Sequence, residues 1–209
     1  MSKYDVIIIG AGPGGIFAAY ELMQKAPELK VAVFEAGNPL EKRKCPIDGK
    51  KVKSCINCKT CAIMSGFGGA GAFSDGKYNI TTQFGGDLHK YVGTEKAIEL
   101  MEYVDTVLCS MGGSDAKLYS TGNTDLKTRA LRNNLHLLDA KVRHLGTDRN
   151  VQILGRIFDY IKDRIDMMFK TSVTEVIHNE NGTFTVKTDK EDEFVCNELV
   201  LAAGRSGSK

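Results

Sequence analysis

The chain of 209 residues contains no tryptophan, only four prolines and no long hydrophobic run. A membrane-spanning helix needs about 20 consecutive apolar residues, so we expect no membrane partner. The first five residues show no secretory pattern and lead straight into an apolar segment, which favours a cytoplasmic location. Neither sign of charge dominates, because 28 basic and 26 acidic residues leave a net charge of +2. This balance argues neither for nor against nucleic acid, and the composition fits a soluble globular chain. We expect no nucleic-acid partner, because the clustered lysines lack the interleaved aromatic residues of single-strand binders.

The sequence also lacks the catalytic patterns of several enzyme classes. No Ser-His-Asp or His-Glu-x-x-His arrangement is visible, which argues against hydrolases and zinc proteases. Of the four histidines, only His144 has suitable neighbours, in the segment Arg143–Asp148, which we expect to be a turn. A histidine can exchange protons near neutral pH, and Arg143 could neutralise a substrate carboxylate. Arg143 and His144 are therefore the catalytic candidates, against the simpler interpretation of a locally satisfied surface turn.

Glycine, by contrast, is abundant, and its first cluster has an ordered context. The apolar segment Val6–Ile9 predicts a strand, which runs directly into the glycine-rich turn Gly10–Gly15. In such a turn Gly10 allows the tight bend, Gly12 lets the backbone approach a pyrophosphate, and Gly15 lets the next helix pack close to the sheet. The phosphates would lie at the positive end of that helix. These features predict a dinucleotide-binding unit.

The residues after the turn continue the same pattern. An amphipathic segment, Gly15–Lys25, predicts the helix, and a second apolar strand, Val31–Phe34, ends at Glu35. A carboxylate at this position can accept hydrogen bonds from ribose hydroxyls and would repel a 2'-phosphate. A non-phosphorylated ribose is therefore favoured. The turn alone does not distinguish FAD from NAD.

Four of the six cysteines gather in a basic segment between residues 40 and 61. Cys55, Cys58 and Cys61 follow the spacing C-x2-C-x2-C, and Cys45 precedes them. This spacing can wrap thiolates around an iron-sulfur cluster or a zinc ion, although the bacterial ferredoxin pattern would place another cysteine soon after Cys61. Two other interpretations stay open. The neighbouring lysines could activate a redox dithiol, or the thiols could be unpaired in a solvated loop.

A second glycine-rich segment, residues 66–77, follows at once and holds five glycines within eleven residues. Such a segment does not favour a helix, but it lets the backbone lie against a flat ligand or phosphates. Ser65, Ser74 and Lys77 could donate hydrogen bonds there. The alternative is a flexible loop, which the apolar rings of Phe67 and Phe73 make less favourable.

The middle and end of the chain predict further elements. Apolar residues at helical spacing predict core-facing helices over residues 94–111, 125–138 and 151–169. Strands are expected over residues 169–177, 183–188, 193–196 and 199–202, with a hairpin turn at Asn181–Gly182. Cys109 and Cys196 lie in apolar segments, where they would simply fill space.

Five segments together resemble a known family. They are the turn at residues 10–15, the cysteine segment, the loop 66–77, the segment 143–148 and the ending 199–207. In combination they resemble the poorly characterised bacterial FAD-dependent dehydrogenases of the glutathione reductase-like superfamily. The resemblance implies an α/β fold: a Rossmann-like FAD/NAD(P)-binding domain with a parallel central sheet, an additional β-meander and an inserted helical region.

The resemblance also implies where a cofactor binds. Val173 matches the strand whose backbone meets adenine, and Ala203 and Gly204 match the second nucleotide motif, in which the usual threonine is replaced by alanine. FAD is the implied cofactor, NAD(P)H a possible electron donor, and an iron-sulfur cluster or zinc a further candidate. The implied cofactor-binding residues are Gly10, Ala11, Gly12, Pro13, Gly14, Gly15, Glu35, Ala36, Gly66, Gly68, Gly69, Ala70, Gly71, Ser74, Lys77, Val173, Ala203 and Gly204.

The same resemblance divides the chain. Residues 1–80 would form the first part of the FAD-binding domain, residues 81–165 a mainly helical insertion, and residues 166–209 the return to the domain. Family members continue with a substrate region and a Gly-Asp segment, so the chain resembles an amino-terminal portion. A portion of this kind could bind adenosine and still lack catalysis.

These observations favour an FAD-dependent oxidoreductase that transfers hydride or electrons through bound flavin, with its substrate unknown. Two alternatives are a non-catalytic dinucleotide-binding protein, which includes a plain NAD-binding domain, and an RNA-modification partner. The latter would use the basic residues of the cysteine segment, but that segment lacks the interleaved aromatic residues typical of single-strand binders.

Overall fold

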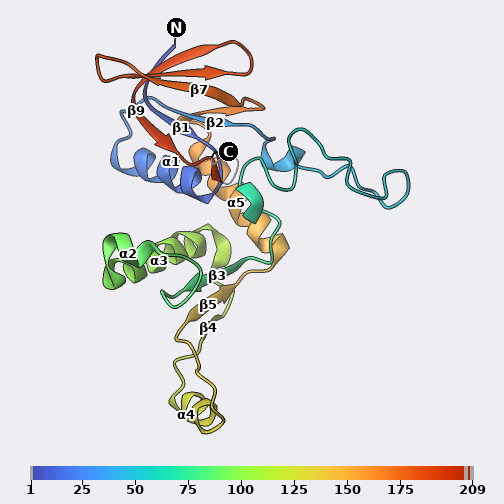
Figure 1. Cartoon of the computed structure of the whole chain (residues 1–209), viewed down its shortest axis with the longest axis vertical. Coiled ribbons are helices and arrows are strands. Elements are labelled where there is room, and N and C mark those ends of the chain that lie inside the picture. The colour runs from blue at the N-terminus through green and yellow to red at the C-terminus, as the bar shows by residue number, and fades with distance from the viewer. Residues whose placement is uncertain (1, 205–206, 208–209) are drawn as a thin grey trace. The chain divides into compact units, whose positions relative to one another are not determined.

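The computed structural model describes residues 2–204 and 207, which form two compact units. The first unit comprises the chain up to Phe73 and again from Leu154 onward, and the second comprises Ser74–Ile153 (Figure 1). Within the described residues no helix is long and apolar enough to cross a membrane.

The first unit is built on a six-stranded sheet with the order β6-β2-β1-β9-β8-β7. The four strands β6 (Ile165–Phe169), β2 (Val31–Glu35), β1 (Ser2–Ile9) and β9 (Glu193–Leu201) run parallel to one another. All five residues of β2 are buried, as expected of a parallel strand that is covered on both faces. The expected parallel central sheet is confirmed.

The other edge of this sheet is antiparallel. Strands β7 (Val173–His178), β8 (Phe184–Thr188) and β9 form a meander that joins the parallel part through the pairing of β9 with β1 (Figure 1). Side chains from both parts share one buried cluster: Tyr4, Ile7, Ile9, Ala32, Phe34, Val186 and Cys196. The expected β-meander is thus confirmed, and Cys196 fills space in the core as predicted.

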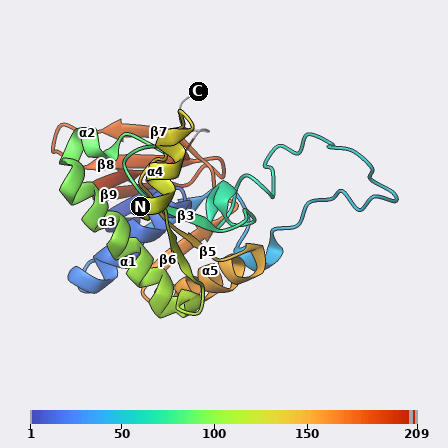
Figure 2. The same cartoon turned by 90° about the horizontal axis from the view of Figure 1, so that it is seen from below.

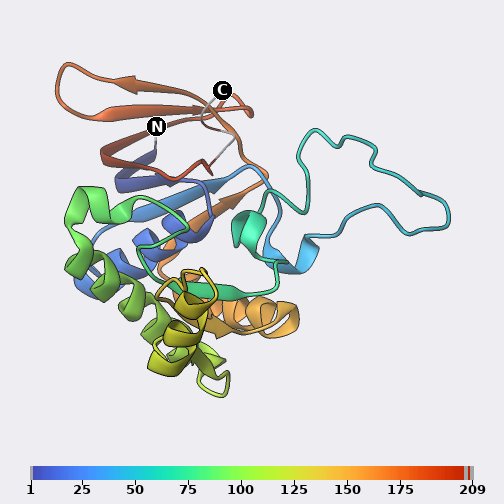
Figure 3. The ribbon, with the colours of Figure 1, turned by 60° about the horizontal axis from the view of Figure 1, so that its bottom comes forward.

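Helices and 3-10 turns complete the first unit. Helix α1 (Pro13–Lys25) follows β1 and buries Ile16, Ala19 and Met23 against the sheet. Helix α5 (Thr147–Ile161) begins in the second unit, and its part from Leu154 onward belongs to the first unit, where it buries Ile157 and Ile161 and leads into β6. Short 3-10 turns, η1 (Leu40–Lys42) and η2 (Gly69–Gly71), lie at the two ends of a long loop that extends away from the sheet (Figures 2 and 3).

The second unit combines a small antiparallel sheet with helices. Strands β3 (Lys77–Ile80), β5 (Lys141–His144) and β4 (Leu118–Ser120) pair in that order. Helices α2 (Leu88–Val92) and α3 (Thr94–Leu108) precede β4, with the π-helical turn η3 (Cys109–Gly113) after α3. Helix α4 (Thr124–Arg132) lies between β4 and β5.

Four element predictions were wrong in part. Residues 165–169 form strand β6 rather than the end of a helix, because the backbone pairs with β2 from Ile165 to Phe169. The helix expected over residues 125–138 ends at Arg132, and none of its residues is buried, so it is not a core face. Arg143 and His144 lie in strand β5 and not in a turn. Residues 193–201 form one strand where two were expected.

Candidate dinucleotide-binding site

A pocket of about 410 Å³ lies where strands β1, β2 and β9 end. In parallel sheets the carboxyl ends of the strands are the usual position of a ligand site. The pocket belongs wholly to the first unit. It is lined by Ile9, Gly10, Gly12, Pro13, Gly14, Phe34, Glu35, Ala36, Met64, Ser65, Gly69, Ala70, Gly71, Thr171, Ser172, Val173, Ala202, Ala203 and Gly204.

Two glycines of the turn are required by the fold itself. Gly10 has a φ of +102°, and a Cβ atom there would lie 2.4 Å from the carbonyl oxygen of Ala202. A Cβ at Gly15 would lie 1.9 Å from the carbonyl oxygen of Gly10, because helix α1 packs directly against the turn. Any side chain at either position would force the backbone apart. These are the roles that the sequence predicts for the two residues.

Gly12 differs, because nothing in residues 2–204 and 207 excludes a side chain there. Its φ is −75°, an ordinary value for any residue, and a Cβ would meet only the Cα atom of Gly69, at 4.0 Å. A Cβ at Gly14 would likewise make only an ordinary contact, 3.8 Å from the side chain of Ala202. Both glycines line the pocket. The space that their missing side chains leave is therefore available to a ligand.

The amino end of helix α1 faces the same pocket. The helix begins at Pro13, its N-cap residue is Gly12, and no side chain caps it. The first N–H groups of a helix lack partners within the helix and, together with the macrodipole, favour an anion. With Gly12 and Gly14 leaving room, this end of the helix fits a phosphate or pyrophosphate group.

Glu35 is buried, with 7% of its surface exposed, and its carboxylate accepts three backbone hydrogen bonds. Oε2 accepts from the N–H of Ala11, and Oε1 accepts from the N–H groups of Gly37 and Gly66, all at 2.8 Å. One acidic side chain thus holds the glycine turn, the end of β2 and the return of the long loop. A carboxylate offers about four acceptor positions, so one position is left for a ribose hydroxyl.

The structure brings most of the predicted cofactor-binding residues together. Twelve line the pocket: Gly10, Gly12, Pro13, Gly14, Glu35, Ala36, Gly69, Ala70, Gly71, Val173, Ala203 and Gly204. Ala11 and Gly15 are buried behind it. That these residues bind FAD stays a prediction.

Four other predicted residues do not line the pocket. The N–H of Gly66 is engaged by Glu35, and that of Gly68 donates to the carbonyl of Ala11 at 2.8 Å. Ser74 and Lys77 belong to the second unit, where the ammonium group of Lys77 lies 2.7 Å from Asp75. The structure therefore gives these residues local roles and does not place them at the site.

The sequence analysis missed several residues that line the pocket. Thr171 and Ser172 come from the segment between β6 and β7, and Met64 comes from the end of the long loop. Ser65, which was expected to donate a hydrogen bond, also lines the pocket. Ile9 ends β1, Phe34 lies one residue before the end of β2, and Ala202 directly follows β9. These three directly precede predicted site residues and could have been identified from them. Thr171, Ser172 and Met64 carry no recognisable motif.

The two catalytic candidates lie in the second unit. The guanidinium group of Arg143 is buried and binds both carboxylate oxygens of Asp105, at 2.5 and 2.8 Å, and the carbonyl of Ala116. The hydrogen bond to Asp105 raises the pKa of Arg143 above its usual value. These bonds give Arg143 a structural role in the second unit, and its role toward a substrate stays a prediction. His144 is exposed beside the segment Leu145–Arg149, with nothing there to assign it a reaction.

The four clustered cysteines are free thiols on the long loop, and all four line a hollow of about 230 Å³. In residues 2–204 and 207, no three His, Cys, Asp or Glu side chains already stand where they could hold a metal ion. The predicted metal centre is therefore not shown.

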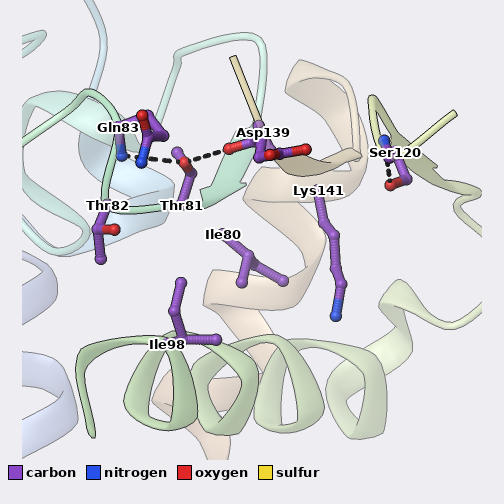
Figure 4. A pocket seen from close by; sticks show the side chains of 10 residues that line it. Ile80, Thr81, Thr82, Gln83, Ile98, Ser120, Asp139 and Lys141 are labelled. Atoms are coloured by element: carbon purple, nitrogen blue, oxygen red, sulfur yellow. Dashed lines mark hydrogen bonds between the residues drawn. The ribbon is translucent and has the colours of Figure 1, made fainter. Parts of the chain in front are cut away.

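The second unit holds a pocket of about 290 Å³ of its own (Figure 4). Ile80 and Ile98 point toward one another across it, and two of its polar side chains, Thr81 and Lys141, have partners within the protein. The hydroxyl of Thr81 donates to the carbonyl of Asp139 at 2.6 Å, and Lys141 pairs with Glu102 at 2.7 Å. This pocket lacks the uncapped helix end that fits an anion in the first unit.

Comparison with known proteins identifies the family. Residues 4–208 match the pyridine nucleotide-disulphide oxidoreductase family. The chain belongs to this family. An uncharacterised protein of Clostridium beijerinckii is 38% identical over 204 residues, which cover 98% of this chain and 31% of that protein. The chain thus spans about a third of that relative. A thiamine thiazole synthase of Phaeosphaeria nodorum is 61% identical over 36 residues, 17% of this chain and 11% of that enzyme.

The fold of this pyridine nucleotide-disulphide oxidoreductase chain is also found in the solved structure of another protein. The glycine oxidase of Geobacillus kaustophilus superposes with a TM-score of 0.57 at 16% sequence identity, over 100% of this chain and 57% of the oxidase. The expected Rossmann-like α/β fold is thereby confirmed.

Proposed function

We propose that the chain is the FAD-binding portion of a flavin-dependent oxidoreductase and that the pocket in the first unit holds the adenosine diphosphate half of FAD. The observation that carries the proposal is the space at Gly12. The fold requires glycine at positions 10 and 15 but not at position 12, where a Cβ would meet nothing closer than 4.0 Å. A glycine that the protein does not need, at the uncapped end of a helix, is explained by a pyrophosphate lying against it.

The other residues of the pocket fit the remaining parts of the cofactor. Glu35 would accept a hydrogen bond from a ribose hydroxyl with its remaining acceptor position, and its charge disfavours a phosphorylated ribose. Thr171 and Val173, on the chain that enters β7, would border the adenine ring. Ala203 and Gly204, after β9, would lie beside the pyrophosphate and the chain that leads toward the flavin.

FAD supplies hydride or electron transfer when it is bound, whereas the protein binds and orients it. The backbone would do most of this binding, because the described residues that line the pocket include one acidic side chain, Glu35, and no basic one. The substrate, the assignment as a dehydrogenase and the use of NAD(P)H as electron donor belong to the whole protein. We propose them on the family membership alone.

A titration with FAD tests the proposal. We expect the chain to quench flavin fluorescence saturably, and Gly12→Ala to weaken FAD binding at least about tenfold, which corresponds to about 1.4 kcal/mol. The thermal midpoint of Gly12→Ala should stay unchanged, because the Cβ has room and the φ is ordinary. Gly155→Ala is the matched control, since its Cβ also meets nothing within 4 Å and it lies in helix α5.

Three results would overturn the proposal: no saturable FAD binding by the unaltered chain, equal affinities of the Gly12→Ala and Gly155→Ala variants, or tighter binding of NADH than of FAD. The last result would identify a plain NAD-binding domain.

A further inference from the structure

The long loop that carries the four cysteines has no use in the proposed FAD site. Residues 43–66, here called the cysteine loop, contain no helix or strand and extend from the first unit (Figures 2 and 3). A loop of this length without secondary structure is uncommon unless it has a function or is disordered. Its large apolar side chains are exposed: Ile47, Ile56, Ile63 and Met64, with 58% of the surface of Ile56 accessible.

The base of the cysteine loop is nevertheless firmly closed. The buried guanidinium group of Arg43 donates to three carbonyls on the returning limb, those of Ala62 at 2.9 Å, Ile63 at 2.7 Å and Phe67 at 2.6 Å. The N–H of Gly66 is fixed by Glu35 at 2.8 Å. These bonds bring the outgoing limb, just before Cys45, beside the returning limb, just after Cys61.

The tip of the loop reverses the chain in a defined turn. Oδ1 of Asp48 accepts hydrogen bonds from the N–H groups of Lys50 and Val52, and the carbonyl of Val52 accepts from Asp48 and Gly49. Cys45 lies before this turn and the other three cysteines lie after it. As a result, one hollow of about 230 Å³ is lined by Cys45, Cys55, Cys58 and Cys61 together with Ile47 and Ile56.

The first C-x2-C step has a further feature of metal-binding turns. The N–H of Asn57 donates to the Sγ atom of Cys55 at 3.4 Å, and Asn57 has a φ of +51°. Hydrogen bonds from the backbone to sulfur tune thiolate metal sites, and asparagine tolerates the left-handed conformation that this turn needs. The polypeptide around Cys55 is thus already bent toward Cys58.

The charge around the loop also suits an anionic centre. Four thiolates around a metal leave a net negative charge, which neighbouring cations stabilise. The loop and its start hold six lysines against two acidic residues, Glu41 and Asp48; the lysines are Lys42, Lys44, Lys50, Lys51, Lys53 and Lys59.

From this geometry we propose that Cys45, Cys55, Cys58 and Cys61 bind one thiophilic metal centre, either a zinc ion or an iron-sulfur cluster. The sulfurs do not yet stand at ligand positions in the described part of the chain, so binding draws them together and orders the loop. The apolar groups at Ile47 and Ile56 then cover the centre. This proposal does not depend on FAD binding.

Metal analysis of the anaerobically purified chain tests the proposal. We expect about one zinc per chain, or iron together with acid-labile sulfide, and these two results distinguish the two forms of the centre. Serine in place of any one of the four cysteines should lower the metal content at least about tenfold. Cys109→Ser and Cys196→Ser are the matched controls and should keep it.

Tryptic cleavage at Lys50, Lys51 and Lys53 gives a second measurement that needs no variant. We expect the loop of the metal-loaded chain to be cut at least about tenfold more slowly than after treatment with a chelator, because the bound metal orders it. Absence of zinc and iron, disulfide formation between the cysteines without metal, or full metal retention in the serine variants would each overturn the proposal.

Discussion

Gly12 and Gly15 belong to the same turn but are glycine for different reasons. Gly15 is required by the protein, because its backbone packs against that of Gly10. Gly12 is required only if something else occupies the space beside it.

Tyr4 combines a buried ring with a hydroxyl group that has a polar partner. Its ring is buried, with 3% of its surface exposed, yet its hydroxyl reaches out and donates to Asp166 at 2.8 Å.

The Tyr4 hydroxyl leads to a prediction about stability at high pH. Burial, and then the hydrogen bond and charge of Asp166, raise the pKa of Tyr4 from 10.0 to about 12. Below pH 10 the tyrosine is protonated in both the folded and the unfolded chain, so its contribution is complete. Between pH 10 and 12 the unfolded chain loses the proton first, and the free energy of unfolding falls by about 1.4 kcal/mol per pH unit.

Urea denaturation of the unaltered chain and of Tyr4→Phe, from pH 8 to pH 12, measures this effect. The difference in unfolding free energy between them should be constant below pH 10 and then change by up to about 2.7 kcal/mol in favour of the phenylalanine variant. Parallel curves throughout the range would contradict the assignment.

Helix α4 is stabilised more by its amino-terminal cap than by burial of its side chains. None of its residues is buried, and Leu131 is 63% exposed. Its amino end is nevertheless capped, because the side chain of Asn123 accepts hydrogen bonds from the N–H groups of Asp125 and Leu126 at 2.9 and 3.1 Å. A helix of nine residues is marginal without tertiary packing, so the cap has a large share in its stability.

We therefore predict that Asn123→Ala destabilises helix α4 by about 1 kcal/mol. Hydrogen exchange of residues 124–132 should become about fivefold faster, since 1.4 kcal/mol corresponds to a factor of ten. Asn123→Ser keeps an acceptor oxygen and should restore most of the protection. Unchanged exchange in Asn123→Ala would show that another contact holds the helix.

Elements were predictable from the sequence where the local pattern had only one interpretation. Strands β1 and β2 and helix α1 surround a glycine turn whose residues each have a physical requirement. Residues 165–169 were misassigned because a short apolar run fits a buried strand and a helix equally well, and its pairing with β2 decides. The small sheet β3-β5-β4 was missed because its strands have only three or four residues, with polar ones such as Lys141.

The residues of the candidate site were likewise predictable only where a local sequence motif marked them. Gly10, Glu35 and Gly204 were predicted because each belongs to a recognisable motif. Thr171 and Ser172 have no such motif. They reach the pocket because β6 pairs with β2, which brings the segment after β6 to the same edge of the sheet. The sequence favoured a substrate carboxylate as the partner of Arg143 and gave no sign of Asp105, which binds it from 38 positions earlier in the chain. Such pairings depend on tertiary structure and leave no trace in local sequence.

At the scale of the whole molecule, the chain passes from the first unit to the second after Phe73 and returns at Leu154. Each unit has its own sheet and its own buried polar anchor. In the first unit the anchor is Glu35, and in the second it is Arg143 with Asp105. The chain covers only about a third of its relative from Clostridium beijerinckii, so further protein accompanies these two units there.

The anchor of the second unit can be tested without touching the pocket. Arg143→Met leaves Asp105 as a carboxylate without its guanidinium partner in a largely buried place, and we expect the second unit to lose about 3 kcal/mol of stability. Faster hydrogen exchange across residues 74–153 is the measurement. Arg129→Met, at an exposed position in α4, is the control and should change little. If the two variants behave alike, the buried ion pair is not the anchor.

The three hydrogen bonds of Glu35 have a consequence for any attempt to redesign nucleotide preference. Replacing the acid at the end of β2 by a small or basic residue is the obvious route to accepting a phosphorylated ribose. Here that change would also strip acceptors from the N–H groups of Ala11, Gly37 and Gly66, each buried donor costing about 1–3 kcal/mol. The proposed role in nucleotide specificity and the role in folding thus belong to the same side chain, and a redesign must first supply new acceptors for all three N–H groups.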